Sequence, residues 1–352
     1  MNLHPLFLRL AASCAALLFG LNAAAAEPVP YKIVTASERG TYIQIGRDIA
    51  KFVAPAADID LDVLPSAGSA ENVQRLRYEP GVKFALVQSD VYQAFLDQAA
   101  GGNAEAGAMI RPLRVIMPLY NEEIYFIARS DSPLEFVHQI RDSRINVGPL
   151  RSGTAMSATT IYRQLFSRAL PDAQSSFLSN EEALVKLVSD KTVDVVVVVA
   201  GQPAKLLVDM KPEARQLVKL LKFDAANPAS AAALKTYFQA TIRASSYPNL
   251  LAADLPGVAV RALFVTYDFR TGTTAAERLS RFARSLCDNF PKLQAEGHPK
   301  WREVQMALPE LGRGWSYYAP MERPLRNCAA RLGRPEPVSA CTQQARVLGL
   351  CK

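Results

Sequence analysis

The chain has 352 residues, of which 49% are hydrophobic, and a formal net charge of +7. This length and apolar content predict two domains, or one large bilobed domain, with well-filled cores. The excess positive charge is spread thinly, without a Lys/Arg run or a basic stripe interleaved with aromatic residues, which argues against nucleic-acid binding.

The first 26 residues have the features of a secretory signal peptide. A weakly basic start with His4 and Arg9 precedes an apolar run from Leu10 to Leu21, and small residues end it, so cleavage is expected after Ala26. The apolar run is shorter than the roughly 20 residues that span a bilayer, which disfavours a membrane anchor. A lipoprotein site at Cys14 is a second alternative. The signal predicts export to the periplasm.

After the signal, strand patterns alternate with helix patterns. Strands are expected at 31–36, 59–64 and 84–87, and helices at 41–53 and 72–78, with another following Asp90. The pattern then restarts, with strands at 113–120, 124–128, 145–148 and 193–199 and helices from Ser152 to Phe166 and at 181–189. Alternation of this kind predicts parallel sheets covered on both faces by helices.

The late strand at 258–267, followed by helical segments at 274–290 and 299–308, is expected to cross back and complete the first sheet. The predicted fold is therefore α/β and two-lobed, with hinge strands crossing between the lobes. We expect a signal peptide at 1–26, lobe 1 at 27–117, lobe 2 at 118–255, a return segment of lobe 1 at 256–326 and a pinned tail at 327–352.

Four cysteines remain after signal cleavage, all in the last 66 residues. An even number of cysteines in an exported protein indicates two disulfides, with three pairings open. A zinc site is the alternative, but the cysteines lack the closely spaced pairs expected of one. The four are Cys287, Cys328, Cys341 and Cys351.

Three turns join a strand to a helix through Gly, Ser and Thr residues. Free backbone N–H groups and the positive end of a helix dipole at such turns bind carboxylates or phosphates. Thr41, Ser69 and Thr154 can cap these helices or contact a ligand. The turns are Ser37–Tyr42, Ser66–Asn72 and Arg151–Thr154.

These turns and several other segments resemble the TAXI-type solute-binding proteins of TRAP transporters. The resemblance covers about residues 31 to 270. It rests on Gly40-Thr41-Tyr42, Ser66 to Asn72, Val87-Gln88-Ser89-Asp90, Val147-Gly148, Ser152-Gly153-Thr154, Ala200-Gly201-Gln202-Pro203, Ala240 to Pro248 and the strand from Val258 to Val265.

The resemblance implies a two-lobed fold like that of periplasmic binding proteins. It also implies a protein that closes on a small organic anion and delivers it to the membrane permease of a TRAP transporter. It implies no cofactor and no catalysis, and we expect a monomer. A second hypothesis keeps the binding module but makes a membrane receptor kinase its partner. A third, an enzyme using Asp90, Glu122 or Glu123, is disfavoured because the chain has no HExxH, Walker-type or Ser/Cys-elbow motif.

The chain departs from the family pattern where Glu38, Arg39 and Arg151 replace small residues. Each arginine either enters the cleft or points to solvent. If they enter, two guanidinium groups would suit a dicarboxylate or an acidic amino acid. The predicted ligand-binding residues are Arg39, Gly40, Thr41, Tyr42, Ser66, Gly68, Ser69, Asn72, Gln88, Ser89, Tyr120, Arg151, Ser152, Gly153, Thr154, Gly201 and Gln202.

Overall fold

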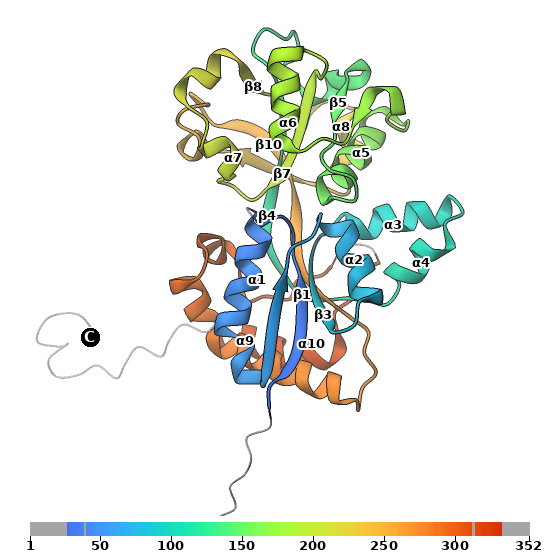
Figure 1. The fold of residues 1–352 in the computed structure, drawn as a ribbon, viewed down its shortest axis with the longest axis vertical. Helices are drawn as coiled ribbons and strands as arrows, with labels where there is room; N and C mark the ends of the chain where they lie inside the picture. The colour runs from blue at the N-terminus through green and yellow to red at the C-terminus, as the bar shows by residue number, and fades with distance from the viewer. Residues whose placement is uncertain (1–26, 39, 312–313, 333–352) are drawn as a thin grey trace, which may run out of the picture.

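Two long antiparallel strands connect the two lobes of the protein (Figure 1). A computed structural model describes residues 27–38, 40–311 and 314–332. The strand β4 (Leu113–Arg129) runs from the lower lobe, lobe 1, into the upper lobe, lobe 2, and β10 (Leu255–Tyr267) returns. Almost every residue of both strands is buried, because each lobe covers part of their length.

Lobe 1 holds the parallel strands that precede β4 and the helices at both ends of the described chain. Its other strands are β1 (Val29–Val34), β2 (Ile59–Leu64) and β3 (Val82–Gln88). Its helices are α1 (Thr41–Phe52), α2 (Ser69–Tyr78), α3 (Val91–Ala100), α4 (Ala104–Ile110), α9 (Thr274–Glu296) and α10 (Ala319–Leu332), with the 3-10 helices η1 (Pro55–Ala57) and η7 (Pro299–Glu303).

Lobe 2 is built from shorter elements. Its other strands are β5 (Ile145–Asn146), β6 (Ser175–Ser176), β7 (Val195–Ala200), β8 (Val218–Leu220) and β9 (Phe238–Ile242). Its helices are α5 (Gly153–Phe166), α6 (Asn180–Val185), α7 (Lys205–Val208) and α8 (Ser230–Ala233), with 3-10 helices at Val137–Asp142, Asp172–Gln174, Pro212–Gln216 and Ala244–Ser246 and a π-helical turn at Lys186–Asp190.

The strands form one continuous sheet in the order β2-β1-β3-β10-β4-β7-β5-β6, with β8 on β4 and β9 on β10. The pairs β1–β2, β1–β3, β5–β6 and β5–β7 are parallel, whereas the pairs that involve β4 or β10 are antiparallel. Because helices α1, α2 and α5 each follow a parallel strand, their starts lie at the strands' carboxyl ends, where ligands of open α/β sheets bind.

Apolar side chains fill both faces of the sheet in each lobe. In lobe 1, α1, α9 and α10 cover one face around Phe84 and Phe282, and α2 to α4 cover the other around Val87 and Leu263. In lobe 2, α5 packs on one face, and α6 and α7 pack on the other. The result is one core on each side of the sheet in both lobes.

The predicted two-lobed α/β fold with crossing hinge strands is confirmed. Two details of the prediction are wrong. The segments 113–120 and 124–128 are one strand, because the polar residues Asn121 to Glu123 between them continue the pairing with β10. The segment 299–308 is helical only as far as Glu303.

The structure confirms one predicted disulfide, between Cys287 of α9 and Cys328 of α10. Cys341 and Cys351, the predicted signal peptide and Arg39 lie outside the described residues. Within those residues, no helix combines the length and the apolar character needed to cross a membrane.

Candidate functional site

The two lobes touch where the starts of α2 and α5 meet. Gly68 precedes α2 with φ 127°, a conformation that favours glycine. A Cβ atom on Gly68 would lie 3.0 Å from the backbone nitrogen of Gly153, the first residue of α5. A Cβ atom on Gly153 would lie 1.9 Å from Oε1 of Gln88. Two predicted ligand residues on opposite lobes are therefore in backbone contact, and the lobes are closed at this point.

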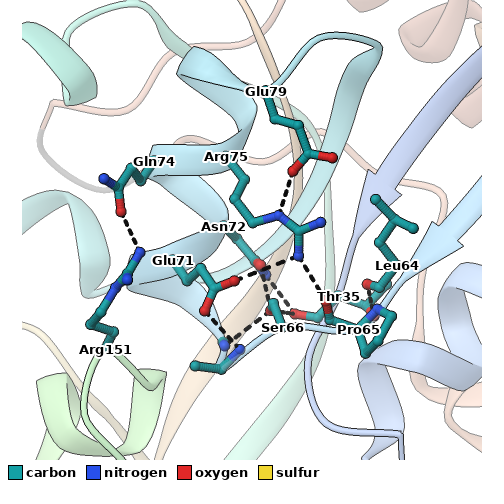
Figure 2. A network of polar contacts seen from close by, with 12 residues as sticks. Thr35, Leu64, Pro65, Ser66, Glu71, Asn72, Gln74, Arg75, Glu79 and Arg151 are labelled. Carbon is teal, nitrogen blue, oxygen red and sulfur yellow. Dashed lines mark hydrogen bonds and ion pairs between the residues drawn. The ribbon is translucent and has the colours of Figure 1, made fainter.

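Ser66 and Asn72 hold the start of α2 against the sheet (Figure 2). Asn72 is fully buried and donates from Nδ2 to the carbonyl oxygens of Thr35 and Leu86, at 2.5 and 2.7 Å. Ser66 Oγ lies 2.6 Å from Asn72 Oδ1 and accepts a hydrogen bond from the Gly68 nitrogen. Asn72 thus links the ends of two strands, which is a positioning role.

Ser69 and Gln88 lie beside Gly153, and both are buried. Ser69 does not cap α2, since it is the first helical residue and α2 has no side-chain cap. Its Oγ instead accepts a hydrogen bond from the Gln88 nitrogen at 3.0 Å. Ser89 accepts from the nitrogen of Arg261 at 3.3 Å, which ties the end of β3 to β10.

The start of α5 is capped by Ser152, whose Oγ accepts from the Ala155 nitrogen at 3.0 Å. Thr154 is half-buried. It is the second residue of the helix, so it is not the cap. Arg151 is exposed, adopts φ 65° and donates to Oε1 of Gln74 on α2 (Figure 2). The guanidinium of Arg151 therefore bridges the lobes at the rim.

Helix α1 brings a tyrosine to the crossing strands. The helix begins at Thr41 after Gly40, with no side-chain cap. Tyr42 is buried, and its hydroxyl donates to Glu122 Oε2 at 2.6 Å. Burial raises the pKa of Glu122 to about 7, and the hydrogen bond from Tyr42 and the positive charge of Lys300 reduce this effect.

The pairing of β10 places Gln88 and Glu122 on the same face of the crossing strands. Gln88 pairs with Ala262, and Glu122 pairs with Val260. Paired residues of antiparallel strands share a face, and residues two apart on a strand do too. The face that carries Tyr42, Gln88 and Glu122 is called the cleft face below.

Sequence reasoning did not assign Asp90 and its two partners to ligand binding. Asp90 lies between β3 and α3. Its Oδ2 accepts from Ser157 Oγ at 2.6 Å and from the Tyr237 hydroxyl at 2.9 Å. Both partners belong to lobe 2. Asp90 Oδ1 is buried and has no hydrogen-bond partner among the described residues. Burial raises the pKa of Asp90, and the two hydrogen bonds oppose this effect.

Tyr120, Gly201 and Gln202 form a separate group near Lys300. A Cβ atom on Gly201 would lie 2.7 Å from Lys300 Cε and 3.3 Å from the Tyr120 ring. Gln202 is buried, donates to the Thr241 carbonyl oxygen and accepts from the Arg243 nitrogen. Both polar ends of the Gln202 side chain are therefore engaged by the backbone at the end of β9.

A family comparison adds to this geometry. The model of the NMT1-like family matches residues 33–309, which is most of the chain and includes every cleft element described above. The chain belongs to the NMT1-like family. This match is coarser than the resemblance to TAXI-type proteins, which stays a prediction for this NMT1-like chain.

Several solved structures are similar to this NMT1-like chain at low sequence identity. The periplasmic binding protein BugD is 12% identical, with 86% of this chain and 94% of BugD covered and a TM-score of 0.45. The arginine-, lysine-, histidine-binding protein ArtJ from Geobacillus stearothermophilus is 11% identical, with coverages of 81% and 98% and a TM-score of 0.44. A TctC solute binding protein from Polaromonas is 14% identical, with coverages of 88% and 99% and a TM-score of 0.40.

The cleft face offers hydrogen-bonding groups and helix starts. Within the described residues, no group of three or more His, Cys, Asp or Glu side chains is arranged to hold a metal ion. The uncapped N–H groups at the starts of α1 and α2 suit an anion. The carboxyl groups of Asp90 and Glu122 suit a hydrogen-bond donor or a cation. This part of the protein therefore combines groups that suit opposite charges.

Proposed function

We propose that this chain is an extracytoplasmic solute-binding protein that captures a small organic anion between its lobes. The observation that carries this proposal is the meeting of the starts of α2 and α5 across the lobe boundary, with the backbone of Gly68 against that of Gly153. An anion held by N–H groups from both lobes would stabilise the closed arrangement, because only that arrangement brings both sets together.

The ligand class is a carboxylate that also carries an amino group, such as an acidic amino acid. The helix starts supply positive potential for the carboxylates. Asp90 Oδ1, buried and without a partner among the described residues, and Glu122 on the cleft face supply acceptors for an ammonium group. This arrangement favours the acidic amino acid over the plain dicarboxylate among the ligands expected from the sequence.

Delivery to a TRAP-type permease is the transport step that we propose, in keeping with the TAXI resemblance. Reconstitution of the permease subunits in vesicles, with an imposed ion gradient, would test it. Uptake of the ligand should require this protein. Uptake that proceeds equally well without it would assign the protein to another partner, such as a receptor kinase.

Calorimetry with glutamate and glutarate tests the ligand class, because the two molecules differ only in the amino group. Glutamate should bind with one-to-one stoichiometry and without turnover, and glutarate should bind about tenfold or more weakly through loss of a charge-assisted hydrogen bond. Failure of both to bind would contradict the proposed ligand class. Tighter binding of glutarate would remove the acceptor role of Asp90 and Glu122.

Arginine substitutions test whether side chains add to the backbone N–H groups in binding the ligand. Arg39→Ala or Arg151→Ala should weaken the ligand by about tenfold or more if the guanidinium binds a carboxylate. Arg270→Ala is a matched control, since Arg270 is an exposed arginine in the loop after β10. Equal affinities for all three variants and the wild type would leave only the backbone N–H groups in the site.

A further inference from the structure

A hollow lies between the lobes, beside the crossing strands. It has a volume of about 590 Å³, and its lining includes Asn121, Glu123 and Arg261 of the crossing strands. Lobe 2 contributes Arg243, and lobe 1 contributes Glu303. This volume is within the range of small-molecule sites. We call this hollow the back groove.

Strand pairing separates the back groove from the cleft face. Arg261 pairs with Asn121, so their side chains share a face. Arg261 is one residue away from Val260 and Ala262, which pair with Glu122 and Gln88. Successive residues of a strand point to opposite faces, so Arg261 and Asn121 point away from the cleft face. A ligand in the back groove would therefore not occupy the proposed cleft site.

Arg261 carries a positive charge that the described residues leave unpaired. Its side chain is half-buried, and none of the described side chains or carbonyl groups accepts a hydrogen bond from it or forms an ion pair with it. Its Nε atom is fully buried. The guanidinium carbon lies 5.5 Å from the centre of the Phe238 ring, which orients the guanidinium plane. Burial lowers the pKa of Arg261, as expected for a cation without a nearby anion.

The acidic groups of the back groove, in contrast, are engaged. Glu123 Oε2 accepts from the Gln202 nitrogen at 2.8 Å. Glu303 accepts from Lys300 at 2.7 Å and lies 3.9 Å from the guanidinium of Arg243. Asp254 accepts from the Ala244 nitrogen at 2.9 Å. The charged group that lacks a partner is the guanidinium of Arg261, so a ligand that pairs with it would be an anion.

The free guanidinium suits a carboxylate or a phosphate, because it presents several N–H donors in one plane. The hydroxyl of Tyr120 does not share this role, although Tyr120 is among the lining residues. Tyr120 is two residues from Glu122 on β4, so its side chain points to the cleft face.

We propose that the back groove is a binding site for a small carboxylate or phosphate anion held by Arg261. The proposal does not rest on the proposed function of the cleft, because Arg261 points away from the cleft face. An anion bound there would contact chain segments of both lobes. Because of this placement, the bound anion would influence how the lobes close.

A titration that observes Arg261 itself tests the proposal. Phosphate and succinate are added separately at constant ionic strength, and the Nε–Hε signals of the arginines are followed by NMR. The Arg261 signal is identified by its loss in Arg261→Gln. At least one of the two anions should shift this signal in a saturable way. No shift with either anion at millimolar concentration would overturn the proposal.

Affinity measurements on variants give an independent test. Arg261→Gln should weaken the anion that shifts the signal by about tenfold or more, because a charge-assisted hydrogen bond is lost. Arg270→Gln makes the same change at an exposed arginine and should leave the affinity unchanged. Equal affinities for wild type and a folded Arg261→Gln variant would overturn the proposal, whether or not the cleft binds its own ligand.

Discussion

Gly68 and Gly153 belong to different lobes, yet a Cβ atom on Gly68 would lie only 3.0 Å from the Gly153 nitrogen. Their contact brings the start of α2 against the start of α5 and defines the closed arrangement of the lobes. Close approach of two backbones requires residues without side chains. The closed arrangement of the lobes therefore depends on a glycine in each of two turns of the sequence.

Gly153→Ala should hinder closure without damaging α5. Alanine is intrinsically better than glycine in a helix by about 1 kcal/mol, but its Cβ would lie 1.9 Å from Gln88 Oε1. We expect small-angle scattering of the ligand-saturated variant to give a larger radius of gyration than that of the ligand-saturated wild type. The double variant Gly153→Ala/Gln88→Ala has a shorter side chain at the obstructing position. It should restore the wild-type radius of gyration.

Gly107→Ala is the matched control, because Gly107 lies within α4 and an added Cβ would meet its nearest neighbour, the Cβ of Ala99, at 3.4 Å. This variant should keep the wild-type radius of gyration. If Gly153→Ala also keeps it, the contact between α2 and α5 does not limit closure.

Arg151→Gly should be more stable than Arg151→Ala, the reverse of the usual order. Arg151 has φ 65°, a left-handed conformation that costs a residue with a side chain about 1 kcal/mol. Both variants lose the hydrogen bond to Gln74, so their difference isolates the backbone cost. Urea unfolding should give a free energy of unfolding higher by about 1 kcal/mol for the glycine variant. A lower value would show that the backbone at this position is not strained.

Much of the fold follows from the sequence, because its signals are local. A strand that ends in Gly, Ser or Thr before an apolar helical pattern predicts the starts of α1, α2 and α5. The continuous β4 could not be predicted, since Asn121, Glu122 and Glu123 resemble a loop when read alone. They remain in the strand because contacts from distant segments, such as that of Tyr42 with Glu122, cover them.

The site was predicted less completely than the fold. The helix starts were found, but the groups that cross between lobes come from distant parts of the chain. Ser157 and Tyr237 reach Asp90 over 67 and 147 residues. Local patterns carry no information about such distances. Asn72 and Ser152 have structural roles that the sequence did not reveal, since their hydrogen bonds go to the backbone, and their contact with a ligand stays a prediction.

Glu122 should make the protein less stable as the pH rises from 4.5 to about 7. Burial raises the pKa of this carboxyl from 4.5 to about 7, so within this window the folded state holds a proton that the unfolded chain has released. The free energy of unfolding therefore falls with rising pH, by at most about 3 kcal/mol, and levels off above the folded-state pKa.

Urea unfolding of wild type and Glu122→Gln at pH 5 and pH 8 measures this contribution. The amide keeps an acceptor for the Tyr42 hydroxyl but does not titrate. Burial also raises the pKa values of Asp90 and Glu123 and lowers that of His298, but these groups are common to both proteins. The free energy of unfolding should therefore fall more, or rise less, between pH 5 and pH 8 for the wild type than for the variant. Parallel pH profiles would contradict an elevated pKa for Glu122.

The disulfide between Cys287 and Cys328 should contribute about 2–4 kcal/mol to the free energy of unfolding. It joins α9 to α10, both sulfurs belong to buried residues, and it closes a loop with a sequence separation of 41 residues. Replacing both cysteines with alanine should lower the free energy of unfolding by about that amount in urea. Peptide mapping under non-reducing conditions should recover the two cysteines in one linked pair, and finding them as free thiols would contradict the bond. The double alanine variant also tests the second predicted disulfide, in the case that it joins Cys341 to Cys351. Reduction should then raise the mass of this variant by two hydrogens. An unchanged mass on reduction would mean that the mature protein has one disulfide.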